Sequence, residues 1–222
     1  MSAQPDGGAA QLLWRALQPA DLPAMHALHL ASVAGVQAAI VKPESREFLQ
    51  ALLAGRGRVL GGWRGQELVA YGVLQHDLLP EDDQRALLGL APAQPLYKLA
   101  GAAVAPAWRG RGLQRLLIQR RMDWAGAAAV IATAAPGNFA SWHSLLACGL
   151  QVRALVRRYG GHARYLLAHV SHEVPFGAGA REVDAQDLAQ QEQLLQSGWR
   201  GVAPGSGGSA LLFAPPSGGG GA

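Results

Sequence analysis

The stretch that decides the fold reads Val104-Ala105-Pro106-Ala107-Trp108-Arg109-Gly110-Arg111-Gly112-Leu113-Gln114-Arg115-Leu116-Leu117. An apolar, strand-like run over residues 99–104 leads into it, and an amphipathic helix is expected over residues 113–124. The first turn of a helix has backbone N–H groups without intrahelical partners, and the helix dipole adds positive potential there. Gly110 and Gly112 lack a Cβ, so a bulky phosphate can approach this backbone closely. The stretch therefore predicts a pyrophosphate site.

Three phosphate motifs compete for this turn. A Walker A loop is excluded because no Lys-Ser/Thr pair follows the glycines. A dinucleotide fingerprint is disfavoured because Arg115 stands where its third glycine belongs. The third motif is Arg/Gln-x-x-Gly-x-Gly/Ala, and Arg109 and Gly112 fit it, with Gln114 in the last position. A basic helix N-terminus without any ligand stays open as an alternative.

With Val104 and Pro106 before it, the turn resembles the acetyl-CoA motif of the GNAT acetyltransferase superfamily, whose members often read V-x-P-x-x-R-G-x-G. Gln114 stands where that family usually has Gly or Ala. The resemblance implies that acetyl-CoA is bound as co-substrate, without a metal. The positions expected to contact it are Ala102, Ala103, Val104, Arg109, Gly110, Arg111, Gly112, Leu113, Gln114, Asn138 and Ser141.

A second motif follows the apolar run at residues 129–134. GNAT enzymes commonly have N-x-x-A/S-x-x-x-Tyr-x-x-x-Gly-Phe here, and Asn138, Ser141, Gly149 and Leu150 match it in register. In the family the Asn contacts the pantetheine arm, whereas a simple helix cap would also explain an Asn at this point. The family's Tyr, which is placed to protonate the departing thiolate, is replaced by Leu145.

The resemblance also implies a mechanism, in which an amine attacks the thioester directly. Such a reaction needs a donor for the developing oxyanion, and the backbone N–H of Val104 is the family's answer. We take His143 and Tyr159 as candidates for the missing proton donor. The sequence shows no clear general base, because the strands on which many members of the family carry a Glu have no Glu in a matching position here. Cys148 is expected to be a small buried side chain.

Composition narrows the class of protein. The chain has 222 residues, of which 50% are hydrophobic and 15% charged, and its net charge is +4. The arginines are dispersed, so no nucleic-acid partner is expected. No apolar run reaches the length of a membrane span, and residues 1–10 lack a signal layout, so neither a membrane nor secretion is expected. A single cysteine, Cys148, fits a reducing compartment, and we expect a cytoplasmic protein.

The predicted element order is βααββ–β–α–β–α–β–β, a mixed α/β arrangement. This order resembles the GNAT fold, a mixed splayed sheet flanked by helices. The second helix is expected to open at Pro43 and Glu44. We divide the chain into a flexible lead (1–10), a GNAT domain (11–172), an accessory helix-strand extension (173–214) and a flexible Gly-rich tail (215–222). The extension is expected to hold a helix over 184–197 and a strand over 210–213.

The favoured function is an acetyl-CoA-dependent N-acetyltransferase acting on a primary amine of a small molecule or peptide, as a monomer or homodimer. A CoA-binding or regulatory module that has lost catalysis is the first alternative, motivated by Leu145 and Gln114. A non-enzymatic interaction domain, docking through its C-terminal helix, is the second. No sequence feature names the acceptor.

Overall fold

The computed structural model describes residues 12–37, 40–41, 43–170 and 176–217. The predicted lead and residues 218–222 of the predicted tail lie outside this part of the chain. The main helices are α1 (Leu22–Val33), α2 (Arg46–Ala51), α3 (Arg85–Leu88), α4 (Leu113–Ala125), α5 (Phe139–Ala147) and α6 (Leu188–Gln196). The strands are β1 (Leu13–Ala16), β2 (Gly57–Arg64), β3 (Glu67–Gln75), β4 (Leu96–Val104), β5 (Ala129–Ala134), β6 (Gln151–Arg158), β7 (His162–His169), β8 (Arg181–Asp184), β9 (Arg200–Pro204) and β10 (Ala210–Ala214).

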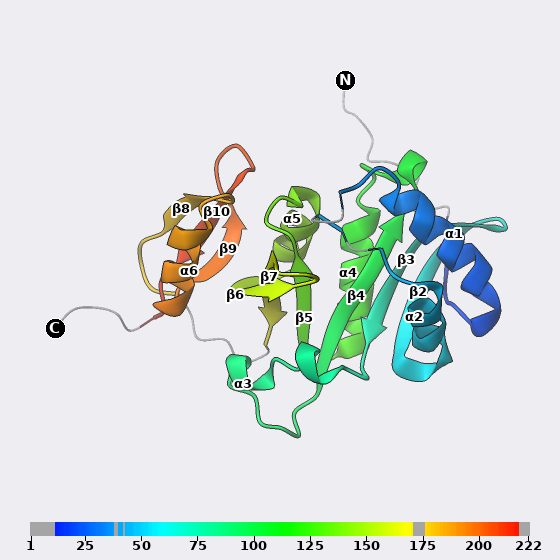
Figure 1. The fold of residues 1–222 in the computed structure, drawn as a ribbon, viewed down its shortest axis with the longest axis horizontal. Helices are drawn as coiled ribbons and strands as arrows, with labels where there is room; N and C mark the ends of the chain where they lie inside the picture. Colours follow the sequence, from blue (N-terminus) through cyan, green and yellow to red (C-terminus); the bar gives the residue numbers. More distant parts are fainter. Residues whose placement is uncertain (1–11, 38–39, 42, 171–175, 218–222) are drawn as a thin grey trace.

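The strands form one sheet in the order β1-β2-β3-β4-β5-β7-β6-β9-β10-β8. Every pairing in it is antiparallel except the one between β4 and β5, which is parallel and forms the centre of the sheet. Helix α4 supplies the crossover between these two strands, as a parallel pair requires. The predicted mixed α/β order through residue 170 is confirmed (Figure 1).

Alternation along the strands assigns the helices to two faces of the sheet. On β3, Tyr71 and Val73 pack in one apolar cluster with α1 and α2. Ala70, on the other face, packs with Leu113 and Leu117 of α4. The sheet is therefore covered by α1 and α2 on one side and by α4 and α5 on the other. Helices α1 and α4 both pack against β3 and β4, from opposite faces.

The expected start of the second helix is wrong by a few residues. Helix α2 begins at Arg46, and the side chain of Ser45 caps it by accepting a hydrogen bond from the Phe48 N–H at 3.1 Å. A serine hydroxyl satisfies one of the free amides of a first turn, so the helix begins after Ser45 and not at Pro43. The segment before Ser45 is instead free to line a cavity described below.

The extension is also richer in strands than expected. Asp184 ends strand β8 instead of opening a helix, and the helix α6 begins only after Asp187, whose carboxylate accepts from the Gln190 N–H at 3.0 Å. Strand β9 is not predicted either, because its sequence Arg-Gly-Val-Ala-Pro has no alternation of apolar and polar residues. The extension therefore joins the sheet as a β-α-β-β unit, through one residue pair, Val152 with Gly201.

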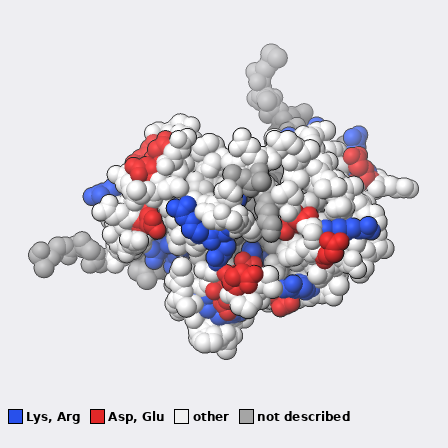
Figure 2. Space-filling view, viewed as in Figure 1, with Lys and Arg blue, Asp and Glu red and all other residues white. Residues whose placement is uncertain are grey.

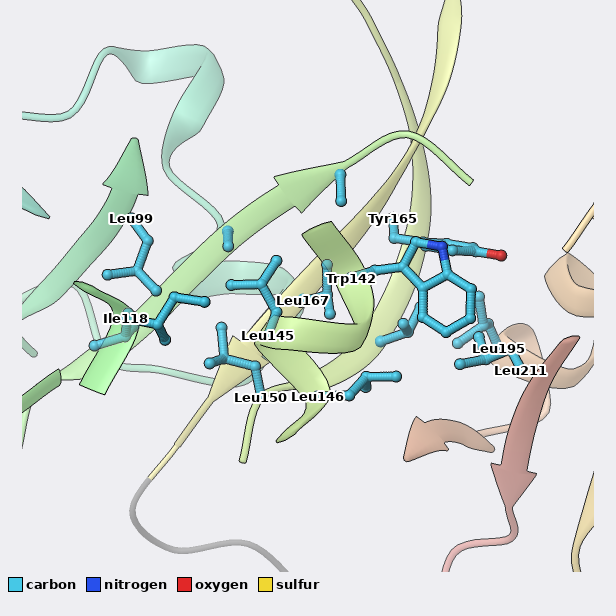
Figure 3. Close-up of a cluster of buried hydrophobic side chains, with 14 of the residues drawn as sticks. Leu99, Ile118, Trp142, Leu145, Leu146, Leu150, Tyr165, Leu167, Leu195 and Leu211 are labelled. Atoms are coloured by element: carbon cyan, nitrogen blue, oxygen red, sulfur yellow. The ribbon is translucent and has the colours of Figure 1, made fainter. Parts of the chain in front are cut away.

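The extension shares a hydrophobic core with α5. Trp142 is fully buried, and its ring meets that of Tyr165 edge-on, with centroids 6.0 Å apart. Leu195 of α6 and Leu211 of β10 lie beside these rings in the same cluster (Figure 3). The same helix, α5, thus contacts the predicted site on one side and the extension on the other.

Candidate active site

The sheet opens at its centre. Strands β4 and β5 pair only over Leu96 to Lys98, opposite Ala129 to Ile131, and the later residues of β4 have no partner on that side. Strand β4 keeps its pairing with β3 through Val104. The two central strands therefore diverge toward their C-terminal ends and leave a wedge between them, which we call the splay (Figure 1).

A bulge at Gly101 deforms β4 beside the splay. Gly72 pairs with Ala102 and Val73 with Ala100, so Gly101 is an extra residue in β4. Beneath it lies Arg121 of α4, which is 2% exposed and donates to the carbonyls of Leu117, Val73 and Ala100 at 2.8, 2.9 and 3.3 Å.

Arg121 occupies space that a side chain at position 72 would otherwise fill. A Cβ on Gly72 would come within 2.8 Å of the Arg121 guanidinium carbon, so glycine is required there. Burial lowers the pKa of Arg121 to about 10, which leaves it charged at neutral pH. A buried cation thus holds two strand carbonyls at the bulge.

The register of β3 and β4 shows which backbone groups face the splay. The Ala105 N–H donates to the Val69 carbonyl at 2.8 Å. Hydrogen-bonded and non-hydrogen-bonded pairs alternate along an antiparallel ladder. The next residue back, Val104, which is opposite Ala70, therefore turns its N–H away from β3 and toward the splay.

The glycine turn lies at the start of α4, as the sequence predicts. Gly110 and Gly112 have φ of 75° and 73°, a left-handed conformation that favours glycine, and Gly112 is the N-cap of the helix. Nothing lies within 4 Å of the place where a Cβ would stand at either glycine. The turn is therefore open on the side that an anion would approach.

The two arginines of this turn have different partners. Arg109 donates from Nη2 to the carbonyl of Ser32 at 2.8 Å, which ties the turn to helix α1. The Arg111 guanidinium lies over the Trp108 ring, 4.8 Å from its centroid. Arg109 lines the cavity described next, whereas Arg111 lies outside its lining.

One cavity of about 880 Å³ joins the splay, the α4 turn and the face covered by α1 and α2. Of the positions expected to contact acetyl-CoA, all but Arg111 line it. Residues from both faces of the sheet contribute: Gln114, Asn138 and Ser141 from the α4–α5 face, and His29, Glu44 and Phe48 from the α1–α2 side. The cavity therefore extends to both faces of the sheet.

The sequence offers two interpretations of Asn138, a helix cap and a cofactor contact, and its position in the structure is compatible with both. Its side chain caps α5 by accepting from the Ser141 N–H at 3.3 Å, and the residue also lines the cavity. Leu145, at the position of the family's Tyr, is 5% exposed and lines the cavity too. A leucine at this point supplies apolar surface and no proton.

The two predicted proton donors lie in different places. The His143 Nε2 is 2.8 Å from the carbonyl of Gly208, in the turn between β9 and β10, and the residue lies outside the cavity lining. Tyr159 does line the cavity. It stands in the β6–β7 turn with φ of 52°, the one positive φ outside glycine in the described residues. A strained backbone at a cavity is a common feature of functional residues.

His29 connects α1 with the segment before α2. Its Nε2 accepts a hydrogen bond from the backbone N–H of Glu44 at 2.8 Å, so the ring proton must be on Nδ1, which lies 2.9 Å from the Tyr71 hydroxyl. Burial, with a smaller contribution from His26, lowers the pKa of His29. Both ring nitrogens are therefore committed to the fold in the neutral imidazole.

Charged residues of the cavity differ in how they are compensated. Lys98, which is buried, forms an ion pair with Asp82 at 2.6 Å. Glu44 is the one carboxylate in the described lining. Arg164, which is 3% exposed, also lines it. On the face shown in Figure 2, basic and acidic side chains lie in small mixed groups instead of one large patch.

Sequence reasoning missed three of these residues: Glu44, Arg121 and Arg164. Glu44 was taken as the opening of a helix, although the serine after it was a better N-cap signal. Arg121 lies at an inward position of an amphipathic helix, where an arginine is unusual and could have been noticed. Arg164 directly precedes the apolar run at residues 165–168 of β7, which is the only trace of its burial in the sequence.

Two further features of the described residues bear on the site. No group of three or more His, Cys, Asp or Glu side chains is arranged there to hold a metal ion. None of the helices in the same part of the chain combines the length and apolar character of a bilayer span.

The comparisons with known proteins agree with this geometry. A model of the acetyltransferase (GNAT) family matches residues 10–150. No curated protein sequence gives a significant match. Among solved structures, the ribosomal-protein-alanine N-acetyltransferase from Brucella melitensis is similar at 22% identity, over 72% of this chain and 99% of that one, with a TM-score of 0.53.

Two similar structures contain acetyl-CoA. The Salmonella typhimurium protein yncA, with its cofactor acetyl-CoA, matches at 19% identity over 73% of this chain and 95% of that one, with a TM-score of 0.55. A phosphinothricin acetyltransferase from Sinorhizobium meliloti, in complex with acetyl-CoA, matches at 13% identity over 72% and 88%, with a TM-score of 0.54. These likenesses show the fold, and the family model covers more than half of the sequence. The chain belongs to the GNAT acetyltransferase family.

Proposed function

We propose that this protein is an N-acetyltransferase that uses acetyl-CoA to acetylate a primary amine. The observation that carries the proposal is the splay: the β4–β5 pairing ends at Lys98, and the glycine turn of α4 lies at the opening. The family match and the acetyl-CoA of the two solved relatives support the choice of co-substrate.

The residues present fit acetyl-CoA. The amides at the start of α4, with Gly110 and Gly112 open on their outer side, suit a pyrophosphate. Asn138 and Ser141 offer polar groups at the start of α5 for the amides of the pantetheine arm. The cavity volume of about 880 Å³ is large enough for this arm and an acceptor together.

When bound, acetyl-CoA supplies an acetyl group activated as a thioester. The Val104 N–H, which faces the splay, is placed to donate to a carbonyl oxygen there and to stabilise negative charge developing on it. Glu44 is proposed to accept a proton from the attacking amine, directly or through a water. Tyr159 is proposed to donate a proton to the leaving sulfur, the role for which Leu145 has no group.

The test is amine-dependent release of CoA. Purified protein should release CoA from acetyl-CoA when a panel of primary amines is added, with one acetylated amine formed per CoA released. Glu44→Gln should lower kcat with little effect on the affinity for acetyl-CoA, whereas Ser45→Ala, a neighbouring change at a helix cap, should affect mainly stability. Absence of CoA release with every amine, despite tight acetyl-CoA binding, would contradict the enzymatic proposal.

Leu145 favours a second candidate, a CoA-binding module without catalysis. The leucine is buried at the position where relatives carry their proton donor, so the chain could keep the cofactor site and lose turnover. The same assay separates the two: saturable acetyl-CoA binding with no CoA release supports the module, and release with any amine rejects it.

A further inference from the structure

Arg164 is a buried cation without a counter-charge in the described part of the chain. Its residue is 3% exposed, and its Nη2 has no hydrogen-bond partner there. The Nη1 donates at 2.9 Å to the carbonyl of its own neighbour, Ala163. Leaving a charged donor buried and unpaired is strongly unfavourable, because its lost hydration is not replaced by a partner. A group that enters the cavity is a natural source of the missing partner.

Its place in the sheet puts Arg164 on the side where a second substrate would enter. On β7, Tyr165 and Leu167 pack toward α5, whereas Leu166 and Ala168 pack toward α3 on the other face. Arg164 is two residues before Leu166, so the two side chains lie on the same face, the one away from α4 and α5. The phosphate turn belongs to α4, which covers the other face of the sheet.

The guanidinium is held in place from one side by Tyr159. The Arg164 guanidinium carbon lies 5.4 Å from the centroid of the Tyr159 ring, and both residues line the cavity. A tyrosine ring over a guanidinium favours the cation but supplies no acceptor in the plane of its N–H groups. Arginine, with a planar fork of donors, matches a carboxylate well.

Lys98 is a second buried cation in this cavity, and it has a counter-charge. It lies on the same face, is buried to a similar degree, and is neutralised by Asp82 at 2.6 Å. Asp82 thus serves Lys98, whereas the one hydrogen bond of Arg164 within the described residues ends on the backbone carbonyl of Ala163. Lys98 thus has a carboxylate partner, whereas Arg164 has none among the described residues.

We infer that Arg164 binds a carboxylate of the acceptor, so that the substrates of this transferase are primary amines bearing a carboxylate, such as amino acids or a peptide with its terminal carboxylate in the cavity. This inference rests on the proposed function. A carboxylate could also come from a dicarboxylic acyl group on CoA, and the experiment below separates the two sources.

The experiment compares amine acceptors in pairs that differ at the carboxylate, with kcat/KM expressed per neutral amine: leucine with leucinamide, and tyrosine with tyramine. CoA release is measured for the wild type, Arg164→Gln and Arg157→Gln. Arg157 lies exposed on the same hairpin, outside the cavity lining, and is the matched control. A charge-assisted hydrogen bond predicts that kcat/KM of the wild type is about 10- to 100-fold higher for the carboxylate member. The ratio should fall to about one in Arg164→Gln and persist in Arg157→Gln.

A binding measurement keeps the inference testable without turnover and without a variant. N-acetyl-leucine and N-acetyl-leucinamide are titrated into the wild-type protein loaded with CoA, and the carboxylate should bind at least about 10-fold more tightly. Equal affinities, or no binding of either, would overturn the inference even where CoA binding and turnover of other amines show that the proposed function stands. Failure of acetyl-CoA to bind at all would instead count against the proposed function.

The acyl arm compares acetyl-CoA with succinyl-CoA, using leucinamide as acceptor. The inference expects acetyl-CoA to be the better donor in both the wild type and Arg164→Gln. If succinyl-CoA is preferred, and the preference disappears in Arg164→Gln, the carboxylate partner of Arg164 belongs to the acyl group and the assignment to the acceptor is wrong.

Discussion

Arg121 is the residue on which the shape of the splay depends most. Its guanidinium donates to the carbonyls of Val73 and Ala100, the residue pair next to the bulge. We expect Arg121→Met to lower the free energy of unfolding by about 2–4 kcal/mol, because buried carbonyls lose their partners. Arg120→Met, on the same helix over the Trp14 ring, should cost less than about 1 kcal/mol. Urea denaturation of both variants measures this, and a stable Arg121→Met protein would refute the role given to this residue.

The sequence allows the glycine turn to be predicted, but not Arg121 or Arg164. Glycines, an N-cap position and the alternation of apolar residues are local signals, and they correctly predicted the α4 turn, β5 and the β6–β7 hairpin. The partners of a buried arginine come from other strands, and nothing in its own neighbourhood names them. The bulge at Gly101 is equally non-local, because it exists only through the register with β3.

At the scale of elements, Asn138 tests whether α5 is only capped or also binds the cofactor. Asn138→Ala should lower stability by about 1 kcal/mol and also weaken acetyl-CoA binding. Asn138→Asp keeps an oxygen that can cap the helix but loses the amide donor, so it should keep the stability and still weaken binding about 10-fold. Thermal unfolding and titration calorimetry give the two readouts. Full affinity in Asn138→Asp would leave Asn138 as a cap alone.

The sequence-based description of the extension failed at the level of elements. Residues 181–184 and 200–204 are short strands with Arg, Glu and Gly, and their pairing partners lie in β10 and β6. Strands this short carry little intrinsic preference, so tertiary pairing decides them. The helix α6, with its Asp187 cap and its leucines at helical spacing, was recognisable apart from its first residues.

For the whole molecule, the shared core predicts that the extension and the rest of the chain unfold together. Phe213 of β10 is fully buried in the cluster that contains Trp142. Phe213→Ala should cost about 3–5 kcal/mol, whereas Leu212→Ala, partly exposed on the same strand, should cost much less. Hydrogen exchange should then accelerate in β5 and β7 as well as in β10. Acceleration confined to residues 176–217 would show a separately folding extension.

Stability should also depend on pH through His29. Burial lowers its pKa in the folded protein, so the unfolded chain binds a proton at higher pH than the folded chain. The stabilisation that neutral His29 contributes is therefore complete above the usual histidine pKa of about 6.5, and it is lost as the pH falls below that pKa. Comparing the unfolding free energy at pH 7.5 and pH 5.5 should show a smaller loss in His29→Gln than in wild type. His162→Gln, at the exposed first residue of β7, serves as the control substitution, and an unaltered pH dependence in His29→Gln would contradict this account.

The central claim is that the turn before α4 holds the pyrophosphate of acetyl-CoA, and calorimetric titration with acetyl-CoA tests it most directly. Gly112→Glu places bulk and a negative charge at the open side of the turn. Gly126→Glu, at the opposite end of the same helix, adds the same side chain at another positive-φ glycine with φ of 60° and serves as the control for backbone strain. We predict saturable binding by wild type and Gly126→Glu, and affinity about 100-fold lower or worse in Gly112→Glu. Unchanged affinity in a folded Gly112→Glu protein would show that the site lies elsewhere.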